Sequence, residues 1–123
     1  MGTWQSGYQE LVVWKEARKL VILTYHLTEK FPRNEDYGLK SQIRRAAVSI
    51  IANIAEGWIR RTIKDKLRFL EISEGSLLEL ETEAIVALDV KYLSQKDFDE
   101  FDQQRSRVAF LLYRYQQSIA KQP

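Results

Sequence analysis

The chain alternates apolar and polar positions with the period of an α-helix along four segments. In each segment apolar residues recur at spacings of three and four, which is the pattern of one buried helix face. This pattern predicts helices over about residues 9–30, 35–59, 63–90 and 95–120. No segment shows the sustained alternation of a half-buried strand. We therefore expect an all-α fold.

Start and stop signals separate the four segments. Pro32 ends the first helix, and Asn34 is the expected N-cap of the second. Gly57 is its expected terminator, because glycine tolerates the left-handed conformation after a helix. The next two starts have capping boxes, Thr62 with Asp65 and Ser94 with Asp97. Short connections make consecutive helices antiparallel, so residues 1–123 are expected to form one up-down-up-down four-helix bundle.

The second helix is apolar on more than one side. Ten of the fourteen residues from Ala46 to Ile59 are apolar, so a single buried face does not account for them. The helix either lies deepest in its own bundle or contacts another subunit, and both alternatives stay open. The candidate residues for a homo-oligomer interface are Ile51, Ala55, Trp58 and Ile59.

Composition is that of a folded soluble protein, and its charge becomes informative only once the bundle is assumed. The chain is 45% hydrophobic and 29% charged, with a net charge of only +2. The bundle would gather residues 1–20, 53–72 and 105–123 at one end, where twelve basic residues face five acidic ones, a net charge of +7. Such an end attracts polyanions. The candidate nucleic-acid-binding residues there are Arg60, Arg61, Lys64, Lys66 and Arg68.

Two further arginines have two alternative roles. Arg44 and Arg45 lie toward the acidic end of the second helix, where carboxylates of the third helix would be their partners. The expected partners are Glu79, Glu81 and Glu83. The alternative is contact with a polyanion, so both arginines join the candidate binding residues. For the basic end, the competing interpretations are a solvated face and head-to-tail contacts between basic and acidic ends.

Several chemistries lack the residues that they need. The chain has no cysteine and one histidine, His26, without the Glu-x-x-His spacing of di-iron bundles. We find no phosphate-binding loop and no nucleophile elbow. We therefore expect no catalytic residue, no metal site and no cofactor. No stretch reaches the ~20 apolar residues of a membrane span, and MGTWQSGYQE is unlike a signal peptide, so a cytoplasmic protein is expected.

Four strings in the chain resemble a known bacterial family. They are LVVWKEA (11–17), YGLKSQIRRAAVSI (37–50), NIAEG (53–57) and GSLLELET (75–82). They resemble the four-helix-bundle family encoded by intervening sequences within 23S rRNA genes. That family is similar to the accessory variability determinant of diversity-generating retroelements, which works beside a reverse transcriptase and its template RNA.

The resemblance implies a ring-like homopentamer whose basic surface binds RNA or DNA without catalysis. By position, its motif points to Gln42, Arg44, Arg45, Asn53, Glu56, Gly57 and Arg61. The chain departs from the family at Ile51, where proline is frequent, and at DVKYL (89–93), which replaces an LGYL-like turn. The leading hypothesis is a non-enzymatic homo-oligomer that binds nucleic acid, as an accessory subunit of a reverse transcriptase. The alternative is a protein-interaction bundle without nucleic-acid affinity.

Overall fold

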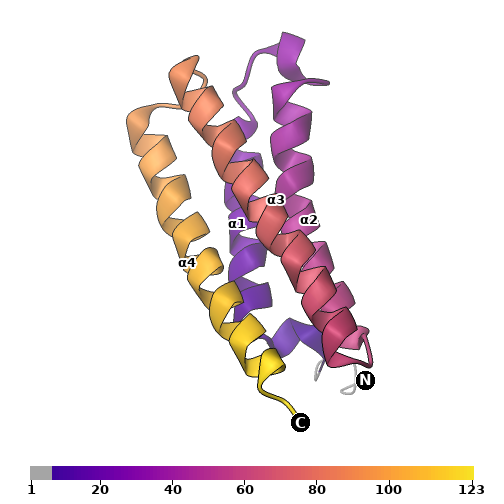
Figure 1. Ribbon diagram of the computed structural model, residues 1–123. Helices are drawn as coiled ribbons and strands as arrows, with labels where there is room; N and C mark the ends of the chain where they lie inside the picture. The colour runs from indigo at the N-terminus through magenta and orange to yellow at the C-terminus, as the bar shows by residue number, and fades with distance from the viewer. Residues whose placement is uncertain (1–6) are drawn as a thin grey trace.

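The computed structural model describes residues 7–123 and is an antiparallel bundle of four α-helices (Figure 1). Its elements in chain order are η2 (Tyr8–Glu10), α1 (Val12–Thr28), η3 (Arg33–Glu35), α2 (Leu39–Ile59), α3 (Ile63–Asp89) and α4 (Gln95–Ala120). The α-helices pack in a closed cycle, α1 on α2, α2 on α3, α3 on α4 and α4 on α1. No strand occurs in this range. The predicted all-α four-helix bundle is confirmed.

The core is built from the helical stripes that the sequence displays. Each α-helix contributes buried side chains at spacings of three, four or seven, so one side of every helix faces the bundle axis. The most completely buried large residues include Leu20, Ile43, Ile50, Ile54, Leu70, Leu80, Val108 and Leu112. These side chains hold the four rods in register along their length. The positions of the charged side chains at each end follow from this register.

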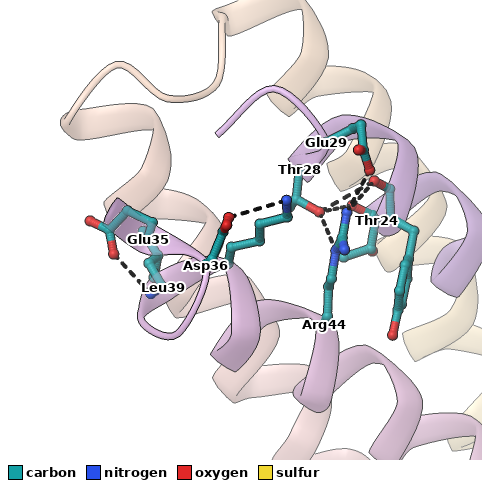
Figure 2. A network of polar contacts seen from close by, with 9 residues as sticks. Thr24, Thr28, Glu29, Glu35, Asp36, Leu39 and Arg44 are labelled. Carbon is teal, nitrogen blue, oxygen red and sulfur yellow. Dashed lines mark hydrogen bonds and ion pairs between the residues drawn. The ribbon is translucent and has the colours of Figure 1, made fainter. Parts of the chain in front are cut away.

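The second helix begins later than the sequence pattern predicts. Residues 33–35 form the short 3-10 helix η3, and α2 starts only at Leu39. Asn34 is therefore not the N-cap. The carboxylate of Glu35 takes that part, because its Oε1 accepts a hydrogen bond from the Leu39 amide at 3.0 Å (Figure 2). Its Oε2 accepts from the Tyr92 hydroxyl at 2.9 Å, which ties this connection to the α3–α4 turn.

Gly57 does not terminate α2, so this prediction is wrong. The glycine is buried inside the helix, which continues to Ile59 and ends with Arg60 in an extended conformation. A Cβ atom at position 57 would lie 3.2 Å from the Lys66 carbonyl oxygen, so glycine allows α3 to approach closely. Gly75 differs, because a Cβ there would meet nothing within 4 Å. A close helix crossing inside the bundle therefore does not explain why glycine occupies this position.

The predicted N-caps Thr62 and Ser94 are confirmed at the two later helices. The Thr62 hydroxyl accepts a hydrogen bond from the Asp65 amide, and the Ser94 hydroxyl accepts from the Asp97 amide, both at 3.1 Å. The intervening turn contains Lys91 with φ 68°, the left-handed conformation that glycine prefers. Lysine therefore occupies a strained position at the C-terminus of α3.

The topology gathers three segments of the chain at one end of the bundle. The described N-terminus, the α2–α3 turn and the C-terminus all lie at the lower end in Figure 1. Residues 7–20, 53–72 and 105–123 therefore share an end, and they contain the twelve basic and five acidic residues counted in the sequence. Residues 1–6 of that prediction lie outside the described part of the chain. We call this region the basic end.

Candidate nucleic-acid interface

The α2–α3 connection brings five basic side chains together. Arg60 follows α2, Arg61 lies in the connection, and the other three belong to the first two turns of α3. We call this set the basic turn, and it consists of Arg60, Arg61, Lys64, Lys66 and Arg68. It lies at the N-terminus of α3, where the helix dipole is already positive. These charges oppose the dipole, so helix stability does not explain their presence.

Three members of the basic turn are held by their neighbours. The guanidinium groups of Arg60 and Arg68 lie 4.9 and 4.8 Å from the centre of the Phe69 ring. Arg60 also pairs with Glu56 one turn back in α2. The ammonium group of Lys66 donates to the Trp58 carbonyl oxygen at 2.8 Å and lies 5.9 Å from the centre of its indole ring. Aromatic rings therefore fix the directions of these cations.

The other two members are open to solvent. Arg61 and Lys64 are exposed, and within residues 7–123 neither makes an ion pair or a side-chain hydrogen bond. Arg68 lies 4.0 Å from Asp65, at the outer limit of an ion pair, and its side chain is 62% exposed. Anions reaching this surface would meet two uncompensated positive charges and a third that is weakly paired.

Arg44 has a structural partner other than the one predicted. Its Nε donates to Thr28 Oγ1 at 2.9 Å, and its Nη2 donates to the Tyr25 carbonyl and the Glu29 carboxylate, both at 3.1 Å (Figure 2). The guanidinium also lies 4.4 Å from the centre of the Tyr25 ring. Because carbonyls in the last turn of a helix lack intrahelical partners, Arg44 acts as a C-terminal cap for α1.

The prediction that Arg44 pairs with Glu79, Glu81 or Glu83 is therefore wrong. Arg44 lies on the side of α2 that faces α1, whereas those carboxylates belong to α3. Glu81 pairs instead with Arg105 of α4 at 3.4 Å, and Arg105 also binds Asp102 at 2.8 Å.

Arg45 approaches the acidic side of α3 without forming an ion pair. Its guanidinium donates to Ser41 Oγ at 3.4 Å, and no carboxylate of residues 7–123 lies within 4 Å of it. Burial raises the pKa of Glu83 from 4.5 to about 7, aided by the charge of Glu79 and opposed by Arg45. One oxygen of Glu83 is buried without a hydrogen-bond partner among the described residues. The expected ion pair of Arg45 is therefore not formed.

The carboxylate of Glu16 organises the α1–α4 side of the basic end. Only 6% of this residue is exposed, and its oxygens bind Lys19 at 2.9 Å, Arg107 at 2.8 Å and Gln104 at 3.1 Å. Hydrogen bonds from Lys19, and then from Gln104 and Arg107, hold the pKa of Glu16 at about 2 despite its burial. The one negative charge of Glu16 is thus paired with the two positive charges of Lys19 and Arg107, so this side keeps a net positive charge.

The candidate interface residues of α2 differ in exposure. Ile51 is partly buried against the core, Ala55 is half-buried, and Trp58 and Ile59 are 37% and 60% exposed. Sequence reasoning left out two members of the same outward stripe, the exposed side chains of Val48 and Ala52. Val48 lies eleven residues and Ala52 seven residues before Ile59, and this helical spacing was the available signal. α2 therefore has an apolar side that its own bundle leaves uncovered.

Of the remaining motif residues, Asn53 has structural partners inside the bundle. Asn53 donates to the Ser49 carbonyl at 2.8 Å, and the hydroxyls of Ser49 and Ser76 lie 2.8 Å apart across α2 and α3. Gln42 is exposed on α2. Ser73 of α3 donates to the Ile50 carbonyl at 2.8 Å, so small polar residues join the two helices closely.

Metal and membrane sites have no structural support in the described chain. Residues 7–123 contain no group of three or more His, Asp or Glu side chains that could hold a metal ion. His26 is exposed on α1. None of the described helices is both long and apolar enough to cross a membrane.

The fold is that of a small four-helix-bundle protein, and one end of this bundle is strongly basic. The family described as 23S rRNA-intervening sequence protein matches residues 9–114, and the chain belongs to that family. This confirms the resemblance seen in the sequence. A comparison with curated proteins finds no match.

A solved structure supports the fold. The chain is similar to a protein with unknown function from the S23 ribosomal protein family of Bacteroides thetaiotaomicron VPI-5482. The two share 19% identity with a TM-score of 0.79, over 85% of this chain and 98% of the other. At this identity the likeness describes architecture alone.

Proposed function

We propose that the chain is a non-enzymatic, homo-oligomeric module that binds nucleic acid through the basic turn. The observation that supports this most directly is the uncompensated charge of Arg61 and Lys64 beside the stacked guanidinium groups of Arg60 and Arg68. Phosphates bind to such groups and release counterions, which makes affinity strongly dependent on salt. RNA and DNA both supply this phosphate chemistry.

The homo-oligomer follows from the outward side of α2. Val48 and Ile59 are 40% and 60% exposed, and Ala52 and Ala55 between them are small enough for close helix approach. A second copy of the chain would cover this stripe and remove its apolar area from water. Light scattering should give a multimer, a pentamer by the family resemblance. Ala52→Glu should dissociate it, whereas Ile22→Glu, on the exposed side of α1, should not.

The setting that we propose is a cytoplasmic complex with a reverse transcriptase and its RNA. Support comes from the resemblance of the family to the accessory determinant of diversity-generating retroelements. Absence of cysteine suits a reducing compartment. Co-purification of a reverse transcriptase encoded beside the gene tests this setting separately from nucleic-acid affinity.

The binding proposal is tested with a mobility-shift titration at 50 and 200 mM salt. The variant combines Arg61→Ala and Lys64→Ala, which lack partners in the described chain and so can be removed without breaking a contact. Its charge-matched control is Arg33→Ala with Lys96→Ala at the opposite end. Affinity should fall for the first pair and stay unchanged for the control. Equal affinity of both pairs would refute the basic turn as the binding surface.

The competing function is a protein-interaction bundle. Its specific support is the exposed apolar stripe of α2, which a foreign protein could also cover. If the wild-type protein fails to shift RNA or DNA at 50 mM salt, the nucleic-acid proposal is wrong and this second function replaces it.

A further inference from the structure

The C-terminal half of α4 has a composition unlike the rest of the chain. Residues 103–123 contain four basic and three aromatic side chains but no Asp or Glu. The basic turn lies on α2 and α3, while this segment belongs to the fourth helix. In Figure 1 the lower half of α4 reaches the same end of the bundle as the α2–α3 turn. The basic end therefore has a second positive surface.

The charges of this segment line up along one side of the helix. Arg107, Arg114 and Lys121 are spaced by seven residues, which is close to two turns, so they lie roughly above one another about 10.5 Å apart. All three are exposed. Phe110 lies between the first two, at i+3 from Arg107 and i−4 from Arg114, and therefore belongs to the same side.

Little inside the bundle neutralises these charges. Arg114 and Lys121 make no ion pair and no side-chain hydrogen bond within residues 7–123. Arg107 pairs with Glu16 at 2.8 Å, yet its side chain is 58% exposed and that carboxylate also binds Lys19. Phosphate groups could therefore approach Arg114 and Lys121 without breaking an ion pair, and could reach the exposed part of Arg107 beside its contact with Glu16.

Two aromatic rings on this half of α4 face water instead of the core. Phe110 is 57% exposed and Tyr113 is 55% exposed. The Arg114 guanidinium lies 5.7 Å from the centre of the Phe110 ring, and the Tyr113 hydroxyl accepts a hydrogen bond from Gln117 at 3.0 Å. These contacts hold the rings at the surface, where more than half of each residue stays exposed to water. Exposed rings between cations are the platform on which unpaired bases stack.

We propose that this α4 face, formed by Arg107, Phe110, Tyr113, Arg114 and Lys121, binds single-stranded nucleic acid. The bases stack on the two rings, and the phosphates contact the three cations. Single strands are favoured over duplexes because a duplex keeps the faces of its bases stacked inside the helix. The inference rests on the proposed function and adds to it a second surface and a preferred form of the ligand.

The experiment compares binding of a single-stranded oligonucleotide and a duplex of the same sequence by fluorescence anisotropy. The aromatic variant is Phe110→Ala with Tyr113→Ala, and its control is Tyr37→Ala, whose side chain is 99% exposed at the other end of the bundle. Losing both stacking platforms predicts single-strand binding weaker by roughly 30-fold or more. Duplex binding should change less than twofold. Arg114→Ala with Lys121→Ala should weaken the binding of both the single strand and the duplex.

Each outcome separates the two proposals. In one outcome the wild type binds, the basic-turn variant loses affinity, and the α4 variants bind both ligands as tightly as the wild type. The α4 inference is then wrong and the proposed function stands. If the wild type binds neither ligand, both are wrong. If Phe110→Ala with Tyr113→Ala changes the oligomeric mass in light scattering while single-strand affinity is unchanged, the face contacts another protein chain and the inference is overturned.

Discussion

Replacing Arg44 by alanine separates a structural role of this residue from a role in binding. The substitution removes the hydrogen bonds to Thr28 and to the Tyr25 carbonyl, together with the stacking contact at 4.4 Å. It also removes the ion pair with Glu29, whose side chain is 78% exposed, so that pair contributes little. The other contacts that are lost are those of a largely buried group, because the Arg44 side chain is only 20% exposed.

The expected cost in unfolding free energy is about 2–3 kcal/mol. Each hydrogen bond to a charged group contributes about 1 kcal/mol or more, and an exposed cation–π contact adds roughly 0.5–1 kcal/mol. Arg44→Lys keeps the charge but loses the fork that reaches two acceptors, so it should recover only part of this stability. Arg45→Ala is the matched control. The side chain of Arg45 is exposed and makes its hydrogen bond to Ser41, so its removal should change stability by less than about 0.5 kcal/mol.

Urea unfolding followed by circular dichroism, at one fixed protein concentration, measures these differences. The midpoint should fall for Arg44→Ala with an unchanged slope, while binding to an oligonucleotide by the still-folded variant should equal that of the wild type. Wild-type stability combined with lost binding would refute the capping role and return Arg44 to the candidate binding residues.

Three further predictions concern glycine, strain and pH. Gly57→Ala should destabilise the fold by about 1–3 kcal/mol, since its Cβ would lie 3.2 Å from a carbonyl oxygen. Gly75→Ala, with free space around the Cβ, should stabilise the fold by up to ~1 kcal/mol in thermal melts. A stability change of the same sign for both variants would contradict the packing. Lys91→Gly should stabilise by about 1 kcal/mol because the φ of 68° suits glycine, and a lower melting temperature would disprove it. The pKa of Glu83 is raised from 4.5 to about 7, so its protonation stabilises the fold below pH 4.5, and this contribution is lost as pH rises through about 7. Glu83→Gln should therefore have a higher melting temperature than the wild type at pH 8 and nearly the same one at pH 4.5. Equal melting temperatures at both pH values would exclude the burial of that charge.

Local chemistry made the helices and two of their starts predictable from the sequence. A hydroxyl three residues before Asp65 or Asp97 satisfies a free amide whatever the rest of the fold does, so both N-caps could be recognised. The apolar stripes likewise required only the helical period. The basic end followed once short connections made the helices antiparallel.

Contacts between distant residues explain what the sequence did not reveal. The start of α2 depends on Glu35, whose second oxygen is bound by Tyr92, 57 positions further on. The partner of Arg44 depends on which side of α2 faces α1, and one residue changes the direction of a side chain by about 100° around a helix. Gly57 was predicted to be a terminator because its close neighbour, the carbonyl of Lys66, belongs to the next helix, and the sequence does not show this contact. In each case the rotation of packed helices decides the outcome.

The salt dependence of oligonucleotide binding tests the central claim most directly. Arg61, Lys64, Arg114 and Lys121 are four of the basic side chains at the basic end that make no ion pair within residues 7–123. If they contact four phosphates of a single strand, the logarithm of the binding constant should fall with the logarithm of salt concentration with a slope of roughly −3. Removing Arg61 and Lys64 should reduce the slope to about half that value. A slope near zero, or no binding by the wild-type protein at low salt, would contradict a nucleic-acid-binding function for the basic end.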